Sequence, residues 1–146
     1  MTSDLQINDY YPGHPLYGGC YSQDELTSKK PDGKFYIINV QAASEGNGTH
    51  WCALVDFTPY PCWIDPFGVV PPPAVLKFMH KSKSKRAMYS KCQYQEVTSD
   101  KCAQFCIAFI DRLLESGGKL SEMDKGMSEE PSARNEAVAK AIRKKM

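Results

Sequence analysis

The chain has 146 residues, of which 42% are hydrophobic and 24% charged, and its formal net charge is +1. This length suits one folded domain, and the hydrophobic fraction excludes a wholly disordered protein. The balanced charge excludes a polyacidic or polybasic tail protein. No run approaches the ~20 apolar residues of a membrane helix, and the first residues lack the basic and apolar segments of a signal peptide. We therefore expect no membrane association and no secretion.

Six cysteines are spread along the chain, and without a secretory signal they are expected to be reduced thiols. Most should be small buried residues, and at least one is a candidate reactive thiol. They are Cys20, Cys52, Cys62, Cys92, Cys102 and Cys106.

The first third of the chain is rich in Gly and Pro, and we expect little regular structure there beyond a short turn near Leu5–Asp9. Apolar runs rich in β-branched and aromatic residues predict strands at Phe35–Val40 and Trp51–Phe57, with a loop at Ala43–Thr49 between them. A short third strand, Cys62–Ile64, follows a proline-containing turn. It should therefore pair with the preceding strand as an antiparallel hairpin.

In the second half, Pro73–His80 has the sequence of a helix that starts at a proline. Cys92–Val97 predicts another strand. Ser99 and Asp100 are candidate N-cap residues of a helix at Cys102–Leu114, where apolar side chains recur at helical spacing.

This order of elements predicts an α+β fold. Residues 1–116 are expected to form a single domain. Residues 117–146 are expected to be a polar C-terminal extension, either a surface helix or a tail.

Four side chains are candidates for the chemistry of a cysteine nucleophile, which needs a nearby imidazole, a group that orients it and a donor for an oxyanion. Cys102 begins the most apolar helix, where the helix dipole favours a thiolate; a buried core cysteine is the alternative. His50 stands at a loop-to-strand junction, although an ordinary polar residue is also common there. If the hairpin forms, Asp65 lies at the same end of the sheet as His50, while the competing Asp56 lies at the far end.

The fourth candidate is Gln95, seven residues before Cys102. Its amide can donate a hydrogen bond to an oxyanion beside the Cys102 backbone N–H. Gln93 and Gln104 are equally open alternatives on pattern alone.

Taken in order, Gly48-Thr-His-Trp51, Trp63-Ile-Asp-Pro-Phe-Gly68 and Gln95 with Cys102 resemble the adenain family of viral maturation proteases, within the ubiquitin-like-protease superfamily. Within this family, the chain most resembles the maturation proteases of virophages and polinton-like viruses. The resemblance covers about Cys20 to Leu114.

The resemblance implies a papain-like architecture of the adenain type. In it, a small mixed or antiparallel sheet packs against a central helix that carries the nucleophile at its N-terminus. It implies that Cys102 is the nucleophile, His50 the general base and acid, Asp65 its orienting partner and Gln95 the oxyanion donor. Ala103 stands where the family usually has Gly, which leaves the shape of the oxyanion hole open.

By the same resemblance, the substrates are viral capsid or core precursor proteins, cut after Gly-containing sites in the virion and in the cytoplasm or nucleus of the infected cell. The chemistry requires no cofactor, but DNA or a viral peptide is expected to activate the enzyme, which we expect to be a monomer. A basic cluster fits non-specific DNA contact, with a solvated surface loop as the alternative. Its candidate contacts are Lys81, Lys83, Lys85 and Arg86.

Three other functions are open to a chain with these residues. A deconjugating protease acting on a host ubiquitin-like modifier would use identical chemistry. A zinc module would use His50, His80 and the cysteines, but only Cys102 and Cys106 have the close spacing of structural zinc ligands, so we expect no metal site. A non-catalytic structural protein with a protease fold is the third.

Overall fold

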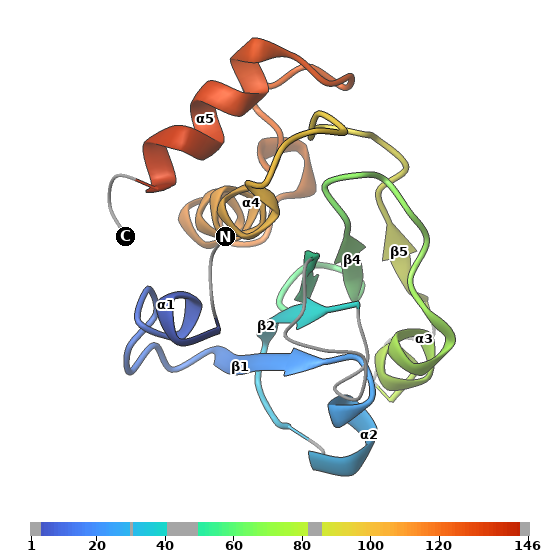
Figure 1. The fold of residues 1–146 in the computed structure, drawn as a ribbon. Coiled ribbons are helices and arrows are strands. Elements are labelled where there is room, and N and C mark those ends of the chain that lie inside the picture. Colours follow the sequence, from blue (N-terminus) through green and yellow to red (C-terminus); the bar gives the residue numbers. More distant parts are fainter. Residues whose placement is uncertain (1–3, 30, 41–49, 82–85, 144–146) are drawn as a thin grey trace.

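In the computed structural model, the described residues are 4–29, 31–40, 50–81 and 86–143, and they form a five-stranded mixed sheet (Figure 1). β3 is antiparallel to both β2 and β4, whereas β1 runs parallel to β2 and β5 parallel to β4. The predicted mixed sheet and its antiparallel β3–β4 hairpin are therefore confirmed. The strands lie in chain order: β1 (Tyr17–Ser22), β2 (Phe35–Asn39), β3 (Trp51–Val55), β4 (Cys62–Ile64) and β5 (Met88–Tyr89).

Helices cover both faces of this sheet. α4 packs against β3, and α5 lies on the side of α4 that faces away from the sheet (Figure 1). α3 and α2 contribute buried residues to the core on the opposite face. No helix of the described ranges is long and apolar enough to cross a membrane. The helical elements are α1 (Asp4–Asn8), α2 (Glu25–Lys29), α3 (Pro73–Met79), α4 (Cys102–Ser116), the 3-10 turn η2 (Leu120–Glu122) and α5 (Ala133–Arg143).

The central strands are apolar on both faces because each face is covered. In β2, Phe35 and Ile37 belong to the core beneath α4, whereas Tyr36 and Ile38 point into the core beneath α3. Side chains alternate across a strand in this way, so a strand buried on both faces has a continuous apolar sequence. The predicted loop at 43–49 lies outside the described residues.

α4 is the central helix of the domain and confirms the helix predicted from apolar spacing. It begins at Cys102 and buries the next eight residues, and it ends where Gly117 adopts a left-handed conformation with φ of 70°. The predicted N-cap is wrong, because the cap residue is Lys101 and no side chain caps the helix. The Ser99 hydroxyl instead accepts a hydrogen bond from the N–H of Lys101 itself at 3.2 Å, two positions before the first N–H group that a cap would bind.

The expectation of little regular structure before Phe35 is also wrong, because β1 and α2 both lie there. β1 has glycines at its centre, a composition typical of turns, yet it pairs in parallel with β2. A Cβ at Gly18 would lie 2.0 Å from Cε1 of Tyr36, so the glycine makes room for this ring. The strand is therefore stabilised by its neighbour and not by its own propensity.

The predicted strand at Cys92–Val97 is absent; this segment is irregular. The N–H groups of Tyr94 and Gln95 both donate to the Pro66 carbonyl, at 2.8 and 3.0 Å, and not to a strand. The segment therefore crosses the loop after β4 and leads the chain back to the start of α4.

α5 adds to the core through Ala139 and Ile142. Asn135 at its start is fully buried, and its amide nitrogen lies 2.9 to 3.1 Å from the carbonyl oxygens of Tyr94, Ser128 and Glu130, which share its two hydrogens. Its amide oxygen accepts from the Ser128 N–H at 2.8 Å. This one side chain thus joins α5 to the irregular segment that contains Gln95.

Replacing Asn135 with Ala should lower the free energy of unfolding by about 2–3 kcal/mol, because it leaves the buried carbonyl of Tyr94 and two part-buried carbonyls without their donor. Urea denaturation followed by circular dichroism measures this change. Asn8→Ala is the matched control: it removes one exposed hydrogen bond, from Tyr17, and should cost less than about 0.5 kcal/mol. Equal losses in the two variants would contradict this role of Asn135.

Candidate active site

The ends of β3 and β4 bring two of the predicted site residues together. His50 directly precedes β3 and Asp65 directly follows β4, so the antiparallel pairing places them at the same end of the sheet. His50 Nε2 lies 2.7 Å from Asp65 Oδ1. Asp56, the competing carboxylate, follows the other end of β3, where its N–H donates to the Lys34 carbonyl.

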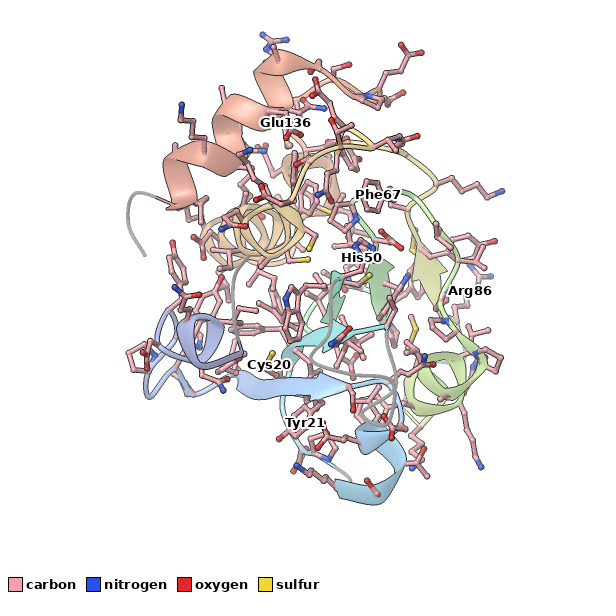
Figure 2. All side chains as sticks on the ribbon, viewed as in Figure 1. Cys20, Tyr21, His50, Phe67, Arg86 and Glu136 are labelled. Atoms are coloured by element: carbon pink, nitrogen blue, oxygen red, sulfur yellow. The ribbon has the colours of Figure 1, made fainter. Side chains whose placement is uncertain are left out.

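The Asp65 carboxylate is 3% exposed and is held from several directions. Its Oδ1 accepts a hydrogen bond from the Phe67 N–H at 2.7 Å as well as the contact with His50. The Phe67 ring also stacks on the His50 ring, with centroids 4.8 Å apart (Figure 2). The Pro-Phe turn after β4 therefore fixes both the carboxylate and the plane of the imidazole.

Its surroundings raise the pKa of His50 to about 9. Burial acts to lower the pKa, but hydrogen bonds with Asp65 and Cys102, together with their negative charges, outweigh it. Because Nε2 is occupied by Asp65, the hydrogen bond with the thiol uses Nδ1. An imidazole with this pKa carries its proton at neutral pH.

Cys102 is the first residue of α4 and is 3% exposed. Its Sγ accepts a hydrogen bond from the Trp51 N–H at 3.4 Å. One turn further along α4, the Cys106 thiol donates to the Trp51 carbonyl at 3.3 Å. The backbone of Trp51 thus attaches the start of β3 to the first two turns of α4, and this brings the thiol to His50.

Gln95 is fully buried in the irregular segment before α4. Its Nε2 donates to the Ser99 carbonyl at 3.0 Å, three residues before Cys102. Its Oε1 has no hydrogen-bond partner within the part of the chain that the structure describes. Gln93 donates to the Gln95 carbonyl, and Gln104 is buried inside α4. Gln95 is therefore the glutamine that lies at the approach to the helix start.

Cys52 is a site neighbour that the sequence reasoning missed. Its thiol hydrogen-bonds to Asp65. Burial raises the pKa of this thiol well above its usual value, and so does the negative charge of Asp65. The signal was available: His50 and Cys52 are two residues apart at a strand, and such residues share one face. A neutral thiol therefore lies behind the His50–Asp65 pair.

The basic cluster is described only at its ends. Lys81 is exposed after α3, and Arg86 is exposed before β5 with its guanidinium 5.8 Å from the centre of the Tyr60 ring. Lys83 and Lys85 lie outside the described residues.

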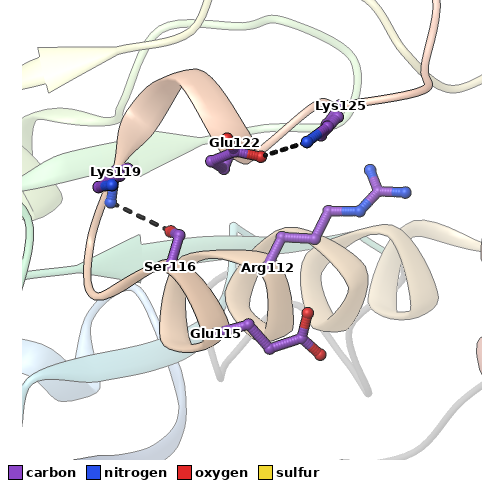
Figure 3. A pocket seen from close by; sticks show the side chains of 6 residues that line it. All are labelled: Arg112, Glu115, Ser116, Lys119, Glu122 and Lys125. Atoms are coloured by element: carbon purple, nitrogen blue, oxygen red, sulfur yellow. Dashed lines mark hydrogen bonds and ion pairs between the residues drawn. The ribbon is translucent and has the colours of Figure 1, made fainter.

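A hollow of about 550 Å³ lies at the other end of α4 (Figure 3). Its charges are mixed, since three cations and two carboxylates line it, and it contains neither a histidine nor a cysteine. It therefore offers no nucleophile–base pair. Its lining residues are Arg112, Glu115, Ser116, Lys119, Glu122 and Lys125.

No protein-family model and no curated protein matches the chain. Among solved structures, the ASFV pS273R protease superposes with a TM-score of 0.59 at 11% sequence identity, over 95% of this chain and 63% of that chain. AvrA, solved with IP6 and CoA, gives a TM-score of 0.40 at 13% identity over 97% of this chain and 67% of that one, a score too low to carry an argument. The chain spans 63% of the length of the ASFV protease, and it has the mixed α/β fold of that protease.

Proposed function

We propose that this chain is a cysteine endopeptidase of the ubiquitin-like-protease superfamily. One observation carries the proposal: a single imidazole, His50, bonds through Nε2 to a buried carboxylate and also to the thiol that begins α4. Nucleophile, base and orienting group within hydrogen-bond reach are the geometric signature of a catalytic triad. The shared fold of the ASFV protease supports the same conclusion.

In the proposed reaction, the Cys102 thiolate attacks the carbonyl carbon of the substrate peptide and forms a tetrahedral oxyanion. His50 then gives its proton to the leaving amine, the C–N bond breaks, and a thioester to Cys102 remains. Neutral His50 next takes a proton from water, whose oxygen attacks the thioester. The C–S bond then breaks, which releases the acid and restores the Cys102 thiolate beside protonated His50. Asp65 keeps the imidazole in the orientation that this exchange requires.

Gln95 is proposed to stabilise the oxyanion together with the Cys102 backbone N–H. An amide nitrogen has two hydrogens, and the Ser99 carbonyl accepts one of them, which orients the amide group. The second hydrogen is the one proposed to meet the oxyanion. Ala103 is buried inside the helix start and adds one methyl group where the resembling family usually has none.

Viral capsid or core precursor proteins are the proposed substrates, with DNA or a viral peptide as activator. The viral origin of the ASFV protease, whose fold this chain shares, supports this proposal. The exposed Lys81 and Arg86 at the ends of the basic cluster support a contact with phosphates.

Brief alkylation at pH 6 should label Cys102 on the order of 100-fold faster than the other thiols, because an ordinary thiol is under about 1% ionised there. Protonated His50 stabilises the thiolate below pH 9; as the pH rises through 9 this proton is lost together with the ion pair, so the selectivity for Cys102 should fall. Mass spectrometry of labelled peptides measures both effects.

His50→Ala and Asp65→Asn should each slow this labelling at pH 6. Cys52 and Cys106 serve as internal controls, because burial raises their thiol pKa values. Uniform labelling of all six thiols, or a rate at Cys102 that His50→Ala leaves unchanged, would contradict the thiolate–imidazolium pair.

Cys102→Ala should abolish hydrolysis of fluorogenic peptides that end in Gly-Gly, and Gln95→Ala should lower kcat by about 10²- to 10³-fold with little change in KM. Gln93→Ala is the matched control and should stay within about twofold of the wild type. A ubiquitin-like protein tested in parallel identifies a deconjugating activity. Equal losses of kcat in Gln95→Ala and Gln93→Ala would contradict the proposed role of Gln95.

Fluorescence anisotropy with double-stranded DNA of arbitrary sequence tests the basic cluster. Replacing Lys81, Lys83, Lys85 and Arg86 with Ala should weaken binding and reduce the slope of log K against log salt, by about 0.9 for each phosphate that the variant no longer neutralises. Lys119→Ala with Lys125→Ala, near the other end of α4, is the matched control. The same slope in both variants would locate DNA binding elsewhere.

A further inference from the structure

Cys52 completes a group of three metal-ligating side chains behind the proposed catalytic pair. One ligand atom each from His50, Cys52 and Asp65 lies within 4.8 Å of the other two, and this is the one such group in the part of the chain that the structure describes. Cys52 is fully buried and Asp65 is 3% exposed. Groups of carboxylates on a protein surface are common without a metal. This group differs from them, because two of its members are buried and its donor atoms are nitrogen, sulfur and oxygen.

The sheet itself brings the three residues together. The β3–β4 register pairs Ala53 with Ile64, so the next pair along the same ladder is Cys52 with Asp65. His50 lies two residues before Cys52 and therefore on the same side of β3. The ligands thus come from the ends of two paired strands, which hold them more rigidly than a loop would.

The donor set favours zinc among common divalent ions. A thiolate and an imidazole suit zinc and its analogue cobalt, whereas magnesium and calcium prefer sites made only of oxygen. Ligand atoms on a tetrahedral zinc lie about 3.3–3.5 Å apart. A pair of atoms at the 4.8 Å limit would therefore approach by about 1.5 Å at most, and the 2.7 Å contact between His50 and Asp65 would lengthen. Three protein ligands leave a fourth position open for water.

We propose that His50, Cys52 and Asp65 form an inhibitory binding site for Zn²⁺ that does not require the nucleophile. Binding would replace the Nε2–Asp65 hydrogen bond with metal coordination and release the Cys52 thiol proton, and the Nε2 proton, to solvent. The proton of the neutral ring would then sit on Nδ1, the nitrogen that faces Cys102. In that state His50 cannot take a proton from the thiol, and this consequence rests on the proposed peptidase function.

Cobalt alone is the probe for the site, because tetrahedral Co²⁺ bound to a thiolate absorbs in the visible and gives a sulfur-to-metal charge-transfer band. The experiment uses the full chain carrying Cys102→Ala, so that neither activity nor a nucleophile–imidazole metal complex contributes to the signal. We expect one equivalent of Co²⁺ to bind, with both bands, and Zn²⁺ to displace it.

Adding Cys52→Ser should abolish the charge-transfer band and weaken binding at least tenfold, and Asp65→Asn should weaken binding while keeping the band. Cys62→Ser is the matched control, since Cys62 is a buried thiol in the adjacent strand but outside the group. Circular dichroism verifies that each variant is folded. Absence of binding, or a band that survives Cys52→Ser, would overturn the site.

An activity arm separates this proposal from the proposed function. In the chain with Cys102 intact, Zn²⁺ should inhibit peptide hydrolysis. Each rate is expressed relative to the metal-free rate of the same variant, and the inhibition constant of Cys52→Ser should then be at least tenfold above that of the wild type. Cobalt binding without any peptidase activity would overturn the function and keep the site. Activity whose zinc sensitivity Cys52→Ser leaves unchanged would overturn the inhibitory role of the site.

Discussion

The antiparallel pairing of β3 with β4 is the constraint on which the candidate site depends. It sets the start of one strand beside the end of the other, and this alone brings His50 within 2.7 Å of Asp65 across fifteen positions of sequence. A slip of one residue would send every side chain of the strand to the opposite face. Burial on both faces of β3 and β4 opposes such a slip, so packing of the core also sets the geometry of the site.

Burial of the Asp65 carboxylate gives this geometry its chemical effect. A charge taken out of water must be compensated by close donors, and here the Phe67 N–H and the His50 ring provide them. The same low-dielectric surroundings strengthen the attraction between the carboxylate and a protonated imidazole. Asp65 thus helps to raise the pKa of the His50 imidazole, and it adds to the effect of burial that keeps the Cys52 thiol neutral.

The C-terminal part of the chain supports the site from the other side. Asn135 binds the Tyr94 carbonyl, and the Glu136 carboxylate accepts the Glu96 N–H at 3.3 Å (Figure 2). The Gln95 segment is therefore held between α5 and the loop after β4, whose Pro66 carbonyl it also binds. The proposed oxyanion donor is positioned by residues on both sides of it in the sequence, although it lies in no regular element.

The sequence by itself determined the elements whose signals are local: the apolar strands β2, β3 and β4, and the helix that begins at Cys102. It also placed a histidine and an aspartate at hairpin ends where pairing would bring them together. Tertiary structure decided the elements without a local signal. β1 is a strand only because β2 lies beside it, and the segment at Cys92–Val97 is irregular because the Pro66 carbonyl takes its N–H groups. The closeness of Cys52 to Asp65 likewise depends on register. Periodicity and propensity are properties of neighbours in the chain, whereas a hydrogen bond is completed only by its partner, and in these cases the partner lies far away in the sequence.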